Sequence, residues 1–209
     1  MTRPAAGWLL GTAAGGFLAG VLVMAVPHRP APVAADRELV APAPAAQAVK
    51  PAATVAPTIG VDPFEDLRKR HLELPVQGLK RQDLRDTFGE TREGTRRHEA
   101  LDILAPRNTP VLAVEDGRVA KLFLSKPGGV TIYQFDPTST YAYYYAHLER
   151  YADGLKDGDP VERGQVIGYV GTSGNAPPNT PHLHFAIFQL TDKKRWWDGV
   201  AIDPYAILK

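Results

Sequence analysis

An antiparallel all-β domain is the fold class that the sequence predicts, and three observations predict it. Between Ala100 and Leu190 the chain consists of short apolar or alternating runs of strand length. Turn residues such as Asp116-Gly117 and Ser173-Gly174-Asn175 separate these runs. No long stretch of helical periodicity lies between them, and parallel strands would need such helices as crossover connections. We therefore expect consecutive strands to pair antiparallel.

The amino-terminal part predicts a membrane anchor. Residues 7–26 form an uncharged apolar run that matches the ~20 residues needed to cross a bilayer. The run is longer than the ~7–15-residue apolar core of a signal peptide, and no clear A-x-A site follows it. We expect residues 1–26 to be a cytoplasmic tip and an uncleaved transmembrane helix, with a cleaved signal peptide as the alternative. A small charge asymmetry favours a cytoplasmic amino terminus, which places the remaining chain outside the cytoplasmic membrane on a single-pass anchor.

A linker and a short lead-in follow the apolar run. Pro, Ala and Val dominate residues 27–60, and proline at this density favours an extended tether. Order is expected to resume at Val61, where Asp62 as N-cap and Pro63 at the first helical position predict a short helix. The rest of residues 61–97 is expected to be a loop leading into the β domain.

Seven strands are predicted in the β domain, residues 98–209. They are residues 102–105, 110–114, 118–124, 130–135, 141–147, 166–170 and 182–190. The closing segment, 198–209, is expected to pack against the β domain. The preceding pair Trp196-Trp197 is interpreted as core rather than as a sugar-stacking surface.

Composition excludes several classes of function. A formal net charge of +1 with 22% charged residues provides no basic patch for nucleic acid. The absence of cysteine excludes disulfides, cysteine-ligated zinc and a cysteine nucleophile.

Histidines occur in three motifs whose spacing suits a metal site. His182 and His184 are two residues apart in a predicted strand, so their side chains point to one face. His98 and Asp102 form H-x-x-x-D. An imidazole and a carboxylate suit Zn²⁺, and a third ligand would leave one position open for water. His147 ends an aromatic strand, and taken by itself it would be interpreted as structural. The H-x-H pair, taken by itself, would be interpreted as a half-buried polar pair. The whole set contains more imidazoles than a structural site uses.

In this order, H-x-x-x-D, Y-x-H-L and H-x-H-F resemble the motifs of the LytM/lysostaphin-type zinc endopeptidases, peptidase family M-23. That family cuts peptide bridges in bacterial peptidoglycan. The resemblance covers roughly residues 74–205 and extends to Phe88-Gly89 with Arg92 and to the Gly-rich stretch 161–171. It implies a half-barrel or sandwich of the duplicated hybrid motif type.

The resemblance also implies roles for five residues. His98, Asp102 and His184 would be the ligands of one Zn²⁺ per chain, and His147 and His182 would be the catalytic histidines. The implied reaction is hydrolysis of peptidoglycan cross-links by water that the metal activates. We expect a D,D-endopeptidase in preference to a polyglycine endopeptidase, since no wall-binding domain accompanies the motifs.

Two other functions remain as alternatives. Some members of the family have lost ligands and act as non-catalytic activators of cell-wall amidases, whereas every motif position keeps its residue here. The stretch 157–166 also resembles the hairpin of biotinyl and lipoyl carrier domains, but no lysine occupies such a turn. Three nearby arginines, Arg92, Arg96 and Arg97, are interpreted as solvated surface residues. Loops at 127–130, 137–140 and 174–181 are expected to border the substrate groove.

Overall fold

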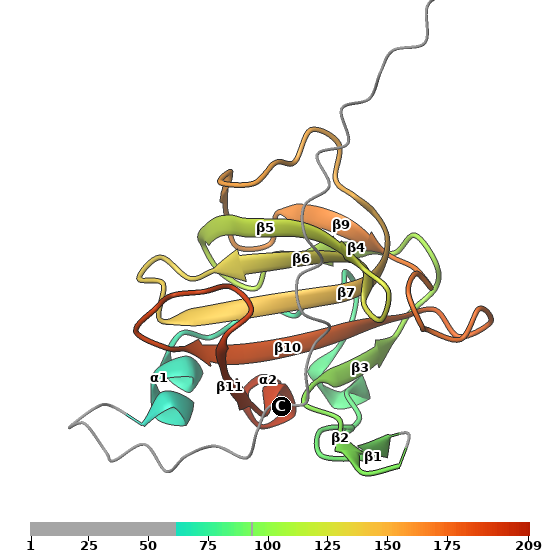
Figure 1. The fold of residues 1–209 in the computed structure, drawn as a ribbon, viewed down its shortest axis with the longest axis horizontal. Helices are drawn as coiled ribbons and strands as arrows, with labels where there is room; N and C mark the ends of the chain where they lie inside the picture. Colours follow the sequence, from blue (N-terminus) through green and yellow to red (C-terminus); the bar gives the residue numbers. More distant parts are fainter. Residues whose placement is uncertain (1–61, 93) are drawn as a thin grey trace, which may run out of the picture. The chain divides into compact units, whose positions relative to one another are not determined.

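The predicted short helix opens the described part of the chain. In the computed structural model, which describes residues 62–92 and 94–209, helix α1 spans Pro63–Lys69 (Figure 1). The Asp62 side chain caps the helix by accepting a hydrogen bond from the Phe64 backbone N–H at 3.0 Å. Pro63 takes the first helical position, where no backbone donor is needed. The prediction of a helix capped by Asp62 is confirmed.

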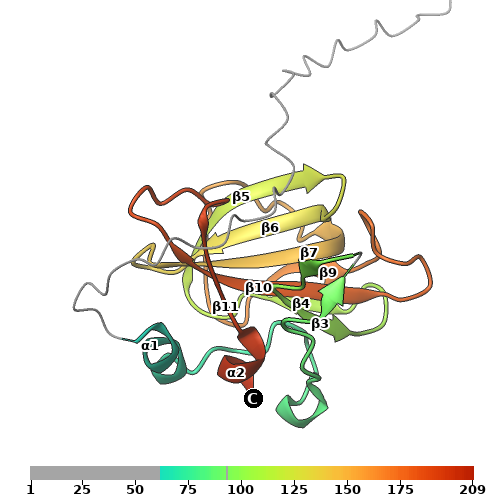
Figure 2. The same cartoon turned by 60° about the horizontal axis from the view of Figure 1, so that its bottom comes forward.

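A nine-stranded sheet of antiparallel pairs makes up the body of the protein (Figures 1 and 2). Its main path is β11-β10-β7-β6-β5-β8; in addition β3 pairs with β10, and β4 pairs with β9, which pairs with β7. The strands are β3 (Leu101–Leu104), β4 (Pro110–Leu112), β5 (Gly117–Ser125), β6 (Gly129–Phe135), β7 (Tyr141–Tyr151), β8 (Pro160–Val161), β9 (Val166–Val170), β10 (His182–Leu190) and β11 (Gly199–Ile202). All seven predicted strands are present, and the antiparallel all-β class is confirmed.

Several short elements escaped the sequence patterns. They are the 3₁₀ helix η1 (Arg81–Asp83), the hairpin β1 (Thr91–Arg92) with β2 (Arg96–Arg97), the strands β8 and β11, and helix α2 (Pro204–Leu208). Each of these helices and strands is two to five residues long, too short to show a period of its own.

Alternation along β10 separates the hydrophobic core from the face that carries the histidines. Leu183 and Phe185 are fully buried, and the Phe185 ring packs against Tyr145 of β7 at a centroid distance of 5.3 Å. Because successive side chains of a strand point to opposite faces, His182 and His184 lie on the other side of the sheet. The rigid, buried side of β10 therefore holds the two histidines in place.

A buried ion network joins the end of α1 to the sheet. Arg70 Nη1 lies 3.1 Å from both Glu115 Oε1 and Asp136 Oδ2, and the Tyr143 hydroxyl donates to Glu115. Burial raises the pKa of Glu115 despite these favourable contacts. Burial also pushes the pKa of Asp136 upward, but its hydrogen bonds, led by that of Thr138, outweigh burial and hold the pKa below its ordinary value. Each charge in this network depends on its partners, since an unpaired buried charge is strongly destabilising.

The predicted transmembrane segment, residues 7–26, and the linker, residues 27–60, lie outside the described residues. Within the described residues, no helix combines the length and the apolar character that crossing a membrane requires. Of the predicted lead-in, 61–97, the described part contains α1, η1 and the β1–β2 hairpin.

Candidate metal centre

The register between β3 and β10 brings Asp102 beside His184. These two residues are Cα partners in the antiparallel pair, so their side chains lie on the same face. His182 lies two residues earlier on that face. His98 precedes β3, and its ring approaches that of His184 to a centroid distance of 4.9 Å. Residues far apart in the sequence therefore meet at one end of β10.

Three electron-pair donors form a compact triangle. His98 Nε2 lies 3.1 Å from Asp102 Oδ1, His184 Nδ1 lies 3.0 Å from the same oxygen, and the two nitrogens are 3.2 Å apart. Zinc bonds of 2.0–2.1 Å in a tetrahedron place neighbouring ligand atoms about 3.3–3.4 Å apart. The triangle thus fits one face of a zinc coordination tetrahedron and leaves the fourth corner open. The same three residues form a potential metal-holding group of the described chain.

Thr87 and Arg92 orient two members of the triangle. The Thr87 carbonyl lies 2.7 Å from His98 Nδ1; because a carbonyl only accepts, Nδ1 carries the proton and Nε2 presents its lone pair to the centre. The Thr87 hydroxyl accepts the backbone N–H of Asp102 at 2.9 Å. Arg92 Nη2 donates to Asp102 Oδ2 at 3.0 Å, which leaves Oδ1 for the triangle. The prediction of Arg92 as a solvated surface residue is wrong, because the folded hairpin turns its guanidinium towards Asp102.

The protonation states at the triangle suit a cation. Burial disfavours the charged form of Asp102, but its close contacts with His184 and His98 outweigh burial and hold the pKa of this carboxyl well below its usual range. Burial lowers the pKa of His184, although Asp102 opposes that shift. A carboxylate and neutral imidazoles are the forms that bind metal ions.

His147 and His182 stand beside the triangle with their own backbone supports. His147 Nδ1 lies 2.9 Å from the Ser173 carbonyl, and His182 Nδ1 lies 2.8 Å from the Thr180 carbonyl. Each Nδ1 therefore carries the proton, and each Nε2 is free to accept one. The two rings are 4.9 Å apart, and the His147 ring is 5.5 Å from that of His184. Burial, followed by the charge of His184, lowers the pKa of His147 to about 4, so this ring is neutral at pH 7.

An irregularity in the sheet sets the orientation of His147. The β6–β7 register shifts between Val130 and Ile132, and His147 has a φ of 60°. Gly129, at a φ of 67°, packs so tightly that a Cβ would lie 2.2 Å from Ser173 Oγ. This close approach fixes the segment whose carbonyl holds the His147 ring.

The structure brings all five predicted site residues together, as follows: His98, Asp102 and His184 in the triangle, and His147 and His182 beside it. Thr87, Ser173 and Thr180 were not predicted. Three of their four contacts with the site use backbone carbonyls, and a carbonyl leaves no signature in the side-chain sequence.

Comparison with known proteins finds one family of peptidases. The family model described as Peptidase family M23 matches residues 96–204. An L-Ala–D-Glu endopeptidase of Bacillus subtilis (strain 168) is 37% identical over 151 residues, which make up 69% of this chain and 44% of that protein. The peptidoglycan DD-endopeptidase ShyC of Vibrio cholerae is 36% identical over 88 residues, 42% of this chain and 19% of that protein. The solved catalytic domain of lysostaphin from Staphylococcus simulans has a TM-score of 0.52 at 27% identity, covering 61% of this chain and 94% of that chain.

The fold and the centre together define a peptidase domain. The chain belongs to peptidase family M23. The matched part spans less than half the length of the two curated relatives named above.

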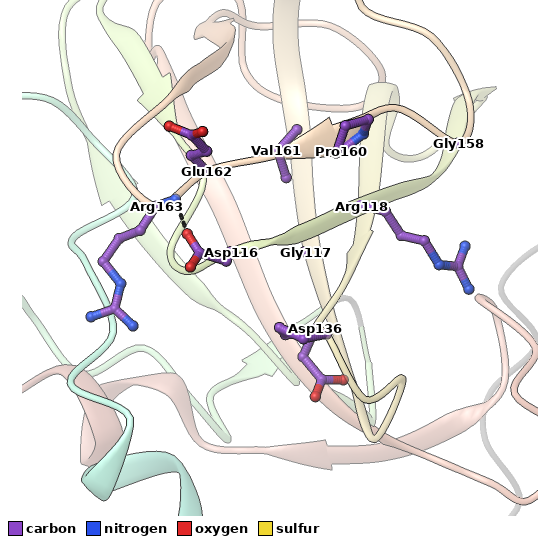
Figure 3. A pocket seen from close by; sticks show the side chains of 10 residues that line it. Asp116, Gly117, Arg118, Asp136, Gly158, Pro160, Val161, Glu162 and Arg163 are labelled. Carbon is purple, nitrogen blue, oxygen red and sulfur yellow. Dashed lines mark hydrogen bonds between the residues drawn. The ribbon is translucent and has the colours of Figure 1, made fainter.

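A pocket of about 770 Å³ is found at a different set of residues, none of which belongs to the histidine cluster (Figure 3). Three of its charged residues, Asp116, Asp136 and Arg163, already have partners in the fold. Asp116 accepts the backbone N–H of Arg163 at 2.8 Å, and the Arg163 guanidinium donates to the carbonyls of His71 and Arg70. Asp136 belongs to the ion network at the end of α1. We interpret this pocket as structural, because Asp116, Asp136 and Arg163 are engaged in contacts that hold the fold together.

Proposed function

We propose that the chain is a zinc-dependent endopeptidase that hydrolyses peptide cross-links of bacterial peptidoglycan by attack of water. The observation that carries the proposal is the triangle of His98 Nε2, Asp102 Oδ1 and His184 Nδ1, with edges of 3.0–3.2 Å. These three residues would hold the ion. Zinc, when bound, lowers the pKa of water to about 7 and polarises the scissile carbonyl.

His147 and His182 supply the proton transfers in this proposal. The carbonyls of Ser173 and Thr180 hold both rings with Nε2 free. One ring takes the proton from the attacking water on its Nε2 and, as the imidazolium it becomes, gives that proton to the leaving amine. The other ring, when it carries a proton on Nε2, stabilises the oxyanion. The low pKa of His147 keeps its ring neutral and able to accept a proton at pH 7.

The bond that we propose is the D,D bond of the cross-link, for which the similarity to a peptidoglycan DD-endopeptidase is the support. The L-Ala–D-Glu bond of the stem is the second candidate, because an L-Ala–D-Glu endopeptidase matches over a longer part of the chain. The presence of all five site residues favours an enzyme over a non-catalytic activator of amidases.

The proposed location is the outer side of the cytoplasmic membrane. An anchor at residues 7–26 and a tether at residues 27–60 would hold the peptidase domain facing the cell wall. Protease treatment of intact spheroplasts tests the location. Before treatment, the domain is expected in the membrane fraction. Protease added outside the spheroplasts is then expected to cleave it.

The test of the proposed reaction combines metal content with product masses. The purified full chain is expected to contain one zinc per chain and to cut cross-linked peptidoglycan, and a chelator should abolish the cutting. The ligand variants are His98→Ala, Asp102→Ala and His184→Ala, and each should lose zinc and activity together. The masses of the products identify the bond, since cleavage of the D,D bond separates two intact stems.

Three further variants complete the design. His147→Ala and His182→Ala should keep zinc and lose turnover, because their rings lie outside the triangle. His71→Ala is the matched control, since His71 is exposed and lies outside the described histidine cluster. Zinc content that is unaffected by all three ligand variants would contradict the metal assignment. Zinc-free protein that binds the wall without cutting it would support the activator instead.

A further inference from the structure

A continuous row of aromatic rings leads away from the metal centre. Starting at His184, successive centroid distances are 6.0 Å to Tyr144, 4.6 Å from there to Tyr133, 4.7 Å to Trp196 and 4.9 Å to Trp197. Each separation falls in the range of interacting aromatic pairs. The row crosses from β10 over β7 and β6 to the loop between β10 and β11.

The sheet register places the first part of this row on the same face as the centre. Tyr144 pairs with Ala186, two residues after His184, and with Tyr133 on the neighbouring strand. Cross-strand partners share a face. The β10–β11 loop then folds back across the sheet and lays Trp196 against Tyr133 and Phe123 (Figure 1).

Trp197 ends the row in solvent. Its side chain is 53% exposed, whereas Trp196 is half-buried. The interpretation of both tryptophans as core is therefore wrong for Trp197, because the loop closes with only the first ring against the sheet. The loop has a defined shape: the Thr191 hydroxyl donates to Asp198 at 3.1 Å, and the Asp198 backbone N–H donates to the Arg195 carbonyl at 3.0 Å.

The loop combines its exposed ring with positive charge. Lys193, Lys194 and Arg195 are all exposed and immediately precede the tryptophans. The Arg195 guanidinium lies 5.7 Å from the Trp197 ring centre. A flat apolar ring beside cations suits a sugar whose C–H face stacks on the ring and which carries acidic groups nearby. In peptidoglycan these features belong to the glycan strand and the carboxylates of its peptide stems.

We propose that Trp197 is a stacking platform for a sugar of the glycan strand, and that the aromatic row guides the attached stem to the metal centre. This proposal rests on the proposed function. Four ring-to-ring steps of about 5 Å give a reach of roughly 20 Å at most, which an extended peptide of about six residues spans. A sugar at Trp197 therefore lies within about 20 Å of the metal centre, a limit that both the D,D bond of the cross-link and the L-Ala–D-Glu bond next to the sugar satisfy.

The experiment compares the kcat/KM of the full chain on two substrates. One is a cross-linked muropeptide dimer that keeps its disaccharides, and the other is the same cross-linked peptide freed of sugar by an amidase. Trp197→Ala is expected to lower kcat/KM about tenfold on the sugar-bearing dimer, equivalent to about 1.4 kcal/mol, and to leave the sugar-free peptide unchanged. Trp197→Tyr, which keeps a ring, should retain most of the native value.

Leu124→Ala is the matched control, because Leu124 is an exposed apolar residue outside the row. Equal kcat/KM values for native protein and Trp197→Ala on the sugar-bearing dimer would overturn the stacking proposal while leaving the endopeptidase standing. A native protein that cuts neither substrate would overturn the proposed function itself.

A membrane surface is the competing partner for a loop rich in tryptophan and lysine. Binding to vesicles of phosphatidylglycerol and phosphatidylethanolamine separates the two. Native protein and Trp197→Ala are expected to bind these vesicles alike. Weaker vesicle binding by Trp197→Ala, together with unchanged kcat/KM on the sugar-bearing dimer, would assign the loop to the membrane instead.

Discussion

Replacing Arg92 by methionine is predicted to weaken zinc binding without removing any ligand. Arg92 Nη2 lies 3.0 Å from Asp102 Oδ2, and the two side chains are 36% and 17% exposed. A hydrogen bond to a charged group contributes roughly 1.5–3 kcal/mol, and partial exposure of Arg92 favours the lower half of that range. At about 1.4 kcal/mol per decade this predicts a loss of about 10- to 40-fold in zinc affinity. The loss lies within the ~10- to 100-fold typical of groups that support metal ligands.

The assay is competition for zinc between the full chain and a chromophoric chelator at pH 7. Arg96→Met is the matched control, because Arg96 is an exposed arginine on the other strand of the same hairpin. Arg92→Lys should fall between native and Arg92→Met, since an ammonium keeps the charge but lacks the planar guanidinium. Binding by Arg92→Met within twofold of native would refute the reasoning, as would an equal loss in Arg96→Met.

Three further outcomes are expected. Because the pKa of Asp136 lies below its ordinary value of 3.8 in the folded protein, its contribution to stability is present above that value and is lost as the pH falls through the lower, folded pKa. Acid titration of unfolding should therefore show a shallower loss below about pH 4 in Asp136→Asn than in native protein. Gly129→Ala should lower the free energy of unfolding by roughly 2–5 kcal/mol, because the new Cβ is strained at positive φ and overlaps Ser173. Gly154→Ala, which has positive φ but open space around it, should lower that free energy by only about 1–2 kcal/mol. Thermal unfolding measures both. Removal of zinc by a chelator should abolish peptidoglycan cleavage, and added zinc should restore it; activity that survives complete removal would contradict the metal-dependent reaction.

Strand alternation made the H-x-H pair of β10 predictable, because the direction of successive side chains is a local property of the backbone. The same reasoning found the seven strands and the Asp62 cap. It could not find Thr87, whose carbonyl and hydroxyl support His98 and Asp102, since that contact depends on where a loop passes in space. The error on Arg92 has the same origin, because no sequence feature tells whether a charged residue in a polar loop is solvated or contacts a partner.

By itself, the sequence determined the antiparallel β class and the order of the strands along the chain, and it predicted the five candidate site residues, whose motifs also carried the family resemblance. These features depend on side-chain period, turn chemistry and residue type, which are properties of neighbouring residues. Tertiary structure alone decided that Asp102 lies beside His184, since the β3–β10 register sets that contact. It also decided that Trp197 ends an aromatic row in solvent, because the exposed fraction of a side chain depends on how distant segments pack around it.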